Sequence, residues 1–470
     1  MLFAAVPGIP GILGEFKGTP WDYQQEDSDS IVKAGWRMIL GHRTGLGKTF
    51  ISLHAASRMS NCQSMLITGI KSSIAVWMLE VPKWTHGEVK YISRVQKDGY
   101  DRFLRCVSGE PGVWLINHSL LRNYMARYQR EFHLKKFKKP RFDMIIVDEA
   151  HKMKNRKSQL FDTVRDMDSR GLLLLTATPA SRGAQDMWAY LNALNSKYFS
   201  SYWKFVNTFC FVDDSGYGRE VYGTRNAEAL KRTLQGCYIK RTYEEVKSQL
   251  PPLRREAIEL EMDPVQERLY REFDDRMILE RPTEGLLVAS GDLAKLSRLR
   301  QLALCPRVLD NEYPLGTCVD GLLEELQDMD PSERHIVVFS VYSRVLEVIG
   351  EELVRCDIPY EFLRGGLEPD EVNEKVARFK EKRKVMLCVL TFAQSFALDT
   401  VRFAYVIGAD FDPINNIQAE GRLRRGDSDL PPEGVLIKYM YPKDTREMAT
   451  KDIINGKVVT VRQFLEDYGS

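Results

Sequence analysis

Short apolar runs alternate with helix-like stretches in two parts of the chain. In the first part, the runs cover residues 37–40, 65–68, 113–117, 144–147 and 172–175. In the second part, they cover 336–339, 361–363, 385–390, 404–407 and 435–439. Runs of this length are typical of strands buried on both faces. Strands that alternate with helices predict an α/β fold with two parallel-sheet lobes.

Between these parts the strand signal fades, from about residue 200 to residue 330. Helical spacing of apolar positions takes over at 202–211, 227–234, 265–277 and 293–304. We therefore predict an amino-terminal lobe over 1–199, helical protrusions and an inter-lobe junction over 200–330, and a carboxy-terminal lobe over 331–470. A length of 470 residues is compatible with two or three domains.

The composition excludes several classes of protein. With 44% apolar and 28% charged residues, the chain is not a mainly disordered polypeptide. Eight cysteines without a C-x-x-C pair predict reduced thiols, with no zinc site and no disulfide framework. No run approaches the roughly 20 apolar residues that cross a bilayer, so we expect no membrane association. The net charge of +2 says nothing about local basic patches. These features predict a cytoplasmic protein.

The segment Gly45-Leu46-Gly47-Lys48-Thr49 follows a predicted strand and opens a predicted helix. Glycines let backbone N–H groups converge on phosphate oxygens, and a helix amino terminus favours an anion. Lys48 would neutralise the β- and γ-phosphates, and the Thr49 hydroxyl would bind Mg²⁺. The eight-residue phosphate-loop pattern requires glycine at position 42, where this chain has His42. The alternative is a glycine-rich turn that contains a lysine by chance.

Asp148 and Glu149 directly follow the run 144–147. A carboxylate at a strand end can hold Mg²⁺ through water, and its neighbour can take a proton from an attacking water molecule. Adjacent acids after a strand are common, which leaves an ordinary surface turn as the alternative. Ligands gather at the carboxyl ends of parallel strands, so we expect this pair to lie near the phosphate loop.

The third candidate group is Gln418, Arg422 and Arg425. On a helix, these positions share one face because they are spaced i, i+4 and i+7. Such a face could present two guanidinium groups to a phosphate, as an arginine finger does. The alternative is a solvated surface helix.

Together these motifs resemble the second helicase superfamily, and the stretches between them resemble its Swi/Snf-type family of double-stranded DNA translocases. The similarity extends from Tyr23 to about Lys457. Tyr23-Gln24 resembles the family's adenine-reading motif, and 148–155 resembles its DEAH-type acidic box. Ser72, Trp77 and Trp84 match its first DNA-contact motif. The segments that contain Lys240-Arg241, Leu299-Arg300-Gln301 and Cys305-Pro306 are the most family-specific.

The resemblance implies two RecA-like lobes and a DNA-dependent ATPase that uses ATP and Mg²⁺ and moves along duplex DNA. It implies catalytic roles for Lys48, Glu149, Arg422 and Arg425. It implies nucleotide contacts from Gln24, Thr44, Gly45, Leu46, Gly47, Lys48, Thr49 and Gln418, and metal contacts from Thr49 and Asp148. Coupling between nucleotide and DNA would involve His151, Thr176 and Thr178. DNA contacts would come from Lys71, Ser72, Asn117, Ser340 and Thr391.

The chain departs from the family pattern at several positions. His42 and Arg43 replace acidic residues, Ala177 replaces glycine, Val372 replaces arginine, and the glycine-rich motif before the finger is reduced to 394–399. These changes indicate a divergent, minimal member. Two alternatives stay open: an ATP-gated DNA clamp with little turnover, and a strand-separating DNA or RNA helicase. The expected setting is DNA repair, recombination or replication, in a bacterial or virus-infected cytoplasm, or in the nucleus of a eukaryote.

Overall fold

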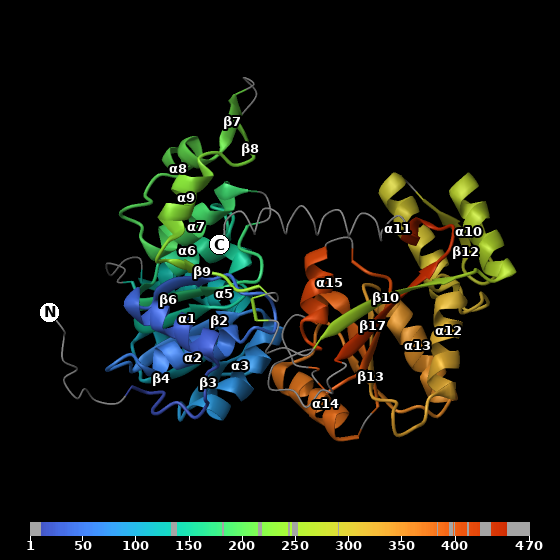
Figure 1. Cartoon of the computed structure of the whole chain (residues 1–470), viewed down its shortest axis with the longest axis horizontal. Coiled ribbons are helices and arrows are strands. Elements are labelled where there is room, and N and C mark those ends of the chain that lie inside the picture. Colours follow the sequence, from blue (N-terminus) through green and yellow to red (C-terminus); the bar gives the residue numbers. More distant parts are fainter. Residues whose placement is uncertain are drawn as a thin grey trace. The chain divides into compact units, whose positions relative to one another are not determined.

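The chain forms two compact units that meet in sequence between Val246 and Lys247. The computed structural model describes residues 11–132, 139–180, 183–214, 219–242, 245–246, 252–289, 291–382, 384–393, 398, 400–410, 413–423 and 434–448. In Figure 1 the first unit runs from blue to green and the second from yellow to red. The boundaries predicted at residues 199 and 330 stay predictions.

The first unit is built on a seven-stranded sheet in the order β3-β4-β2-β5-β6-β1-β9. Every pairing in it is parallel. The strands are β1 (Arg37–Leu40), β2 (Ser64–Gly69), β3 (Val89–Ile92), β4 (Gly112–Asn117), β5 (Arg141–Val147), β6 (Asp168–Leu175) and β9 (Tyr238–Ile239). The central strands read as continuous apolar runs because helices cover both of their faces.

Helix α1 precedes the first strand of this unit, and the other helices lie between strands along the chain. The helices are α1 (Asp22–Lys33), α2 (Lys48–Ser57), α3 (Lys71–Trp84), α4 (Gly99–Val107), α5 (His118–Phe132), α6 (Gln159–Arg165), α7 (Met187–Leu194), α8 (Tyr202–Phe209) and α9 (Ala227–Leu234). A hairpin of β7 (Phe211–Asp214) and β8 (Arg219–Tyr222) follows α8 and projects away from the sheet in Figure 1. The strand–helix alternation leaves the turns at the carboxyl edge of the sheet free to build a site.

The second unit is built on a six-stranded parallel sheet in the order β10-β17-β16-β13-β15-β14. Its strands are β10 (Leu253–Leu260), β13 (Ile336–Ser340), β14 (Tyr360–Leu363), β15 (Val385–Val389), β16 (Phe403–Ile407) and β17 (Val435–Pro442). Its helices are α10 (Pro264–Arg276), α11 (Asp292–Leu304), α12 (Thr317–Asp328), α13 (Ser343–Arg355), α14 (Pro369–Lys382) and α15 (Pro413–Glu420). The predicted α/β class with two parallel-sheet lobes is confirmed.

Between residues 200 and 330, where helical protrusions were predicted, the structure has strands as well as helices. The four predicted helices are present as α8, α9, α10 and α11, but the segment also contains two hairpins and β10. The second of these hairpins pairs β11 (Ile278–Arg281) with β12 (Gly285–Val288). Strand β10 lies at the edge of its sheet and is largely exposed, so its sequence needs no apolar run. Strands β3 and β9 are also edge strands, and for the same reason no apolar run predicted them.

A buried ion pair fastens the second unit. The Arg300 guanidinium in α11 donates to the Glu447 carboxylate, and its Nη2 also donates to the Ala409 carbonyl at 2.6 Å. Both charged side chains are almost fully buried, so each charge is compensated by the other.

Among the described helices, none is long and apolar enough to cross a membrane. All eight cysteines are described, and each is a free thiol.

Candidate functional site

The carboxyl edge of the first sheet gathers most of the predicted site residues. Leu40 pairs with Leu175, and Val147 pairs with both Leu174 and Thr68, so four strands end at nearly the same level. The segments that follow these strands are the phosphate loop after β1, the start of α3 with Lys71 and Ser72 after β2, Asp148 and Glu149 after β5, and Thr176 after β6. Strand β4 ends there with Asn117. The structure therefore brings together positions that lie more than a hundred residues apart in the sequence.

The phosphate loop depends on two glycines with left-handed backbone conformations. Gly45 has φ +81° and Gly47 has φ +69°, and Gly47 forms the amino-terminal cap of α2. A Cβ at Gly47 would lie 2.6 Å from Gln24 Nε2, so the buried Gln24 amide rests directly against the loop. The Trp21 backbone N–H donates to Gln24 Oε1 at 3.0 Å and fixes that amide. Gln24 thus lies beside the loop, where a nucleotide contact was predicted.

Lys48 is folded back onto the loop. Its Nζ donates to the His42 carbonyl at 2.9 Å and to the Arg43 carbonyl at 3.4 Å. Thr44 and Leu46 are buried within the loop, while Thr49 is half-buried in the first turn of α2. An ammonium group, a helix amino terminus and glycine N–H groups together suit a phosphate chain.

Asp148 is held on several sides at the end of β5. Its Oδ2 accepts a hydrogen bond from Trp77 Nε1 at 3.0 Å, and its Oδ1 accepts one from the Glu149 N–H at 2.9 Å. Burial and the adjacent Glu149 carboxylate raise the pKa of Asp148, and the bond from Trp77 and the Lys48 charge act in the opposite direction. The Thr49 hydroxyl and the Asp148 carboxylate are the hard oxygen donors that Mg²⁺ prefers, so these residues fit the metal.

Glu149 occupies a left-handed backbone conformation, with φ +49°. Its carboxylate is buried, and Oε2 lies 3.0 Å from His151 Nδ1. His151 belongs to the 3₁₀ turn Ala150–Met153 that follows the acidic pair. A buried carboxylate beside an imidazole can accept a proton and be stabilised afterwards, as a general base requires.

His118 forms a second support for Asp148, and no sequence motif singled out this histidine. Its Nε2 lies 2.9 Å from the Asp148 carbonyl, and its Nδ1 lies 3.1 Å from Thr68 Oγ1. Because a carbonyl only accepts, Nε2 holds the proton, and Nδ1 accepts from the Thr68 hydroxyl. Burial lowers the pKa of His118 to about 4, so the ring is neutral at physiological pH.

Trp77 and Trp84 were expected in a DNA-contact motif, but their side chains lie in the protein interior or pack on other rings. Trp77 is fully buried and bonded to Asp148, and Trp84 packs edge-on against Phe50 with ring centroids 4.9 Å apart. The helical spacing of Ile74, Trp77 and Val81, all buried, is the signal that could have indicated an inward face.

The predicted coupling residues lie beside the end of β1. The Thr176 backbone N–H donates to the Leu40 carbonyl at 3.0 Å, and Thr176 Oγ1 accepts from the Thr178 N–H at 3.1 Å. Both threonines are buried. They follow β6, which is sandwiched in the sheet between the acidic strand β5 and the phosphate-loop strand β1. This turn therefore lies between the strand that precedes the acidic pair and the strand that precedes the phosphate loop.

The predicted DNA-contact residues of the first unit differ in burial and in hydrogen bonding. Asn117 Oδ1 accepts from the Leu120 N–H at 2.9 Å and thereby caps α5. Ser72 is buried in the first turn of α3, while Lys71 before it is half-buried. In the same unit, the part of the chain that the structure describes holds no cluster of three metal-ligating side chains.

In the second unit, helix α15 holds Gln418 but ends at Glu420, just before Gly421. Arg422 lies in the turn that follows, and its Nε donates to the Ala393 carbonyl at 3.1 Å. Arg422 therefore does not share a helical face with Gln418, contrary to the prediction from the sequence spacing. Arg425 lies outside the described residues.

Gln418 is buried, and its Oε1 has no hydrogen-bond partner among the residues that the structure describes.

The two predicted DNA residues of this unit lie at the carboxyl ends of the neighbouring strands β13 and β15. Ser340 ends β13, is buried, and accepts from the Tyr342 N–H at 3.1 Å. Thr391 is exposed in the 3₁₀ turn Leu390–Phe392 that follows β15.

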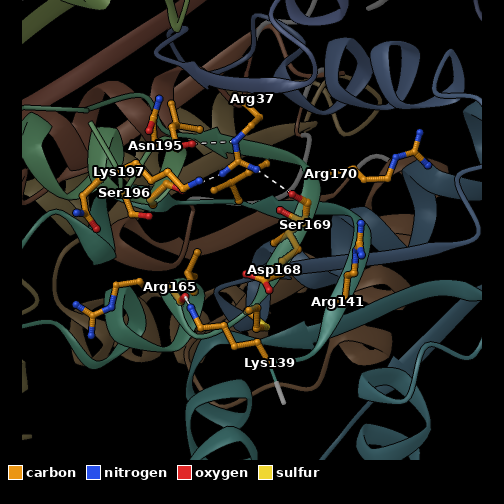
Figure 2. A pocket seen from close by; sticks show the side chains of 17 residues that line it. Arg37, Lys139, Arg141, Arg165, Asp168, Ser169, Arg170, Asn195, Ser196 and Lys197 are labelled. Atoms are coloured by element: carbon orange, nitrogen blue, oxygen red, sulfur yellow. Dashed lines mark hydrogen bonds between the residues drawn. The ribbon is translucent and has the colours of Figure 1, made fainter. Parts of the chain in front are cut away.

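A separate cavity of about 590 Å³ opens at the amino ends of β1, β5 and β6 (Figure 2). Its wall includes Arg37, which donates to the carbonyls of Leu194 at 2.8 Å, Ser169 at 3.0 Å and Ala193 at 3.0 Å. These bonds use the guanidinium to tie β1 to the end of α7. Since the strands are parallel, the cavity lies at the edge opposite the phosphate loop, and none of the predicted site residues lines it.

Comparison with known proteins gives two family matches, the SNF2-related domain over residues 24–307 and the helicase conserved C-terminal domain over residues 319–427. Over 453 residues the chain is 23% identical to "Protein CHROMATIN REMODELING 5" of Arabidopsis thaliana, covering 87% of this chain and 25% of that protein. Over 444 residues it is 26% identical to "SWI/SNF-related matrix-associated actin-dependent regulator of chromatin subfamily A member 1" of Mus musculus, covering 87% of this chain and 40% of that protein. The chain thus spans well under half the length of these relatives.

Among solved structures, the "Sulfolobus solfataricus SWI2/SNF2 ATPase core in complex with dsDNA" is 18% identical and has a TM-score of 0.43, covering 98% of this chain and 97% of that chain. At that score, the likeness adds nothing to the family matches.

Proposed function

Because this chain belongs to the SNF2-related domain family, whose match covers 24–307, we propose that it is a DNA-dependent ATPase that moves along duplex DNA. The observation that carries this proposal is the meeting of Lys48, Asp148 and Glu149 at one edge of a parallel sheet, beside a loop shaped for phosphates. Burial and the Glu149 carboxylate raise the pKa of Asp148, and the Lys48 charge opposes that rise, which fits a lysine and a carboxylate acting on one ligand.

In the proposed reaction, Lys48, whose Nζ is held at the loop by the His42 and Arg43 carbonyls, binds the β- and γ-phosphates of ATP. Mg²⁺ supplies charge neutralisation on those phosphates, and Thr49 and Asp148 are the residues that would hold it. Glu149 accepts a proton from the attacking water, and His151 Nδ1 lies 3.0 Å from Oε2 of that carboxylate. Arg422 and Arg425 stabilise the transition state, a role worth about 10³–10⁵ in rate for an arginine finger.

We infer that Gln24 contacts the adenine, with Thr44, Gly45, Leu46, Gly47 and Gln418 completing the nucleotide site. The turn with Thr176 and Thr178, together with His151, would relay nucleotide state to the DNA track. DNA would be bound through its phosphates by Lys71, Ser72, Asn117, Ser340 and Thr391, so binding should weaken steeply with salt and depend little on sequence. The cellular setting that we propose is DNA repair, recombination or replication, in the cytoplasm or a nucleus.

The test measures phosphate release by the purified chain without nucleic acid and with duplex DNA, single-stranded DNA or RNA. We expect duplex DNA to stimulate most. Lys48→Ala and Glu149→Gln should abolish the stimulated rate, while Lys33→Ala, an exposed lysine of α1, should leave it unchanged.

Three results would contradict the proposal. Undiminished turnover in Lys48→Ala or Glu149→Gln would remove the assignment of the site. A wild-type chain that binds ATP and duplex DNA without turnover would favour the clamp alternative. Greater stimulation by single-stranded DNA or RNA would favour a strand-separating helicase.

A further inference from the structure

His42 occupies the position where the phosphate-loop pattern requires glycine, and its side chain is completely buried. Its Nε2 lies 2.8 Å from Oδ2 of Asp27, a buried carboxylate in α1. Arg241 approaches the same carboxylate from another side, with Nη2 at 2.8 Å from Oδ1 and Nε at 3.1 Å from both oxygens. The three residues form a network that we call the Asp27 brace. It joins the phosphate loop to α1 and to the chain that follows β9.

The Asp27 brace includes His42, whose backbone carbonyl accepts a hydrogen bond from Lys48. The His42 carbonyl accepts the 2.9 Å hydrogen bond from Lys48 Nζ, while the His42 ring is bonded to Asp27. The backbone is fixed in the same place, because the Gly41 N–H donates to the Ile239 carbonyl at 2.7 Å and the Arg43 N–H to the Arg241 carbonyl at 3.3 Å. The loop is therefore bound by side chains from α1 and by main chain from the segment after β9.

The charges of the brace are arranged to hold it together. Burial lowers the pKa of His42, against the opposing effect of Asp27, so the ring is neutral and donates from Nε2. Burial acts to raise the pKa of Asp27, but the bonds from His42 and Arg241 outweigh it and lower that pKa. A buried carboxylate that accepts hydrogen bonds from three N–H groups is costly to move, because any displacement leaves charge without compensation. His42 is thus anchored although it stands at a glycine position.

We propose that Asp27 is a positioning residue for nucleotide binding, which acts through His42 with support from Arg241 to hold the loop carbonyls on which Lys48 rests. This inference depends on the proposed nucleotide site. It predicts that the brace sets the affinity for ATP more than the rate of the chemical step. The competing view is that His42 merely crowds the loop and that a glycine would bind phosphate better. The two views predict opposite effects of one substitution.

The experiment compares wild type with His42→Gly, Asp27→Ala, Arg241→Lys and the double variant Asp27→Ala/His42→Gly. We measure KM and kcat for ATP, equilibrium binding of a fluorescent ADP, and the thermal midpoint. The control is Asp29→Ala, which removes the exposed partner of Arg58 from the same helix. Each brace variant should weaken ADP binding and raise KM by about tenfold with kcat within about twofold, while the control stays unchanged.

The double variant shows whether Asp27 acts through His42. If it does, Asp27→Ala/His42→Gly should bind ADP no more weakly than the weaker single variant, because both changes remove one connection. Additive losses, or ADP binding by His42→Gly at wild-type strength or tighter, would overturn the proposal. Should Asp27→Ala melt early, His42→Gly and Arg241→Lys decide by the same criteria. A wild type that binds ADP but does not hydrolyse ATP would count against the motor alone, since the binding comparison still tests the brace.

Discussion

The indole N–H of Trp77 donates to Oδ2 of Asp148 at 3.0 Å, and this bond joins α3 to the end of β5. Trp77 is fully buried, so the bond is shielded from water. The other carboxylate oxygen accepts from the Glu149 N–H at 2.9 Å, so both oxygens are oriented before any ligand arrives. Trp77, which belongs to a segment that resembles a DNA-contact motif, thus orients the carboxylate that we propose holds Mg²⁺.

Replacing Trp77 with Phe removes that donor and keeps most of the ring volume. A hydrogen bond to a charged group contributes about 1.5–3 kcal/mol, so we expect the Mg²⁺ concentration for half-maximal ATP hydrolysis to rise by about tenfold. The Mg²⁺ dependence of ADP binding gives a second readout. Trp84→Phe is the matched control, because the Trp84 indole donates to Glu80 instead. Equal Mg²⁺ dependence in the two variants would refute the positioning role.

His118 predicts a pH dependence of stability. Its pKa is about 4 in the folded chain against an ordinary 6.5, so the unfolded chain binds more protons between these values. The stability that the neutral ring contributes is complete above pH 6.5 and is lost as pH falls towards 4, by about 3 kcal/mol at most. In urea titrations, His118→Gln should show a flatter fall in the free energy of unfolding over this range. Curves of equal slope for both proteins would show that His118 does not titrate as stated.

Arg422 and Arg425 are predicted to act on the transition state rather than on nucleotide binding. Arg425→Ala should bind fluorescent ADP normally and hydrolyse ATP at least 10³-fold more slowly, by the usual effect of an arginine finger. Arg422→Ala also removes the bond to the Ala393 carbonyl, so Arg422→Lys is included to keep the charge. Lost ADP binding together with an unchanged rate per bound ATP would contradict the finger role.

The Arg300–Glu447 pair predicts a large stability effect confined to the second unit. Glu447→Ala leaves the Arg300 charge buried, and we expect it to lower the free energy of unfolding of that unit by about 3–5 kcal/mol. Arg300→Met/Glu447→Leu removes both charges and should cost much less. Urea titrations of all three proteins check this. A double variant as unstable as Glu447→Ala would show that packing, and not the unpaired charge, sets the loss.

Most of the fold follows from local sequence patterns, because strands buried on both faces must be apolar throughout. Strands β1, β2, β5 and β6 and their order along the chain were therefore predictable, and so was the glycine-containing turn between β1 and α2. Strand β10 was not predictable, since an exposed edge strand gains its stability from hydrogen bonds to β17 that no local pattern records.

The sequence alone singled out Lys48, Asp148 and Glu149 as candidates for one site, because they follow predicted strands and the carboxyl ends of parallel strands meet at one edge of the sheet. It was not enough to pair Trp77 with Asp148, or Asp27 with His42 and Arg241. Those partners lie up to 214 residues apart, and only the packing of helices against the sheet brings them within hydrogen-bond distance. A hydrogen bond depends on separations of tenths of an ångström, which local spacing along a chain does not fix.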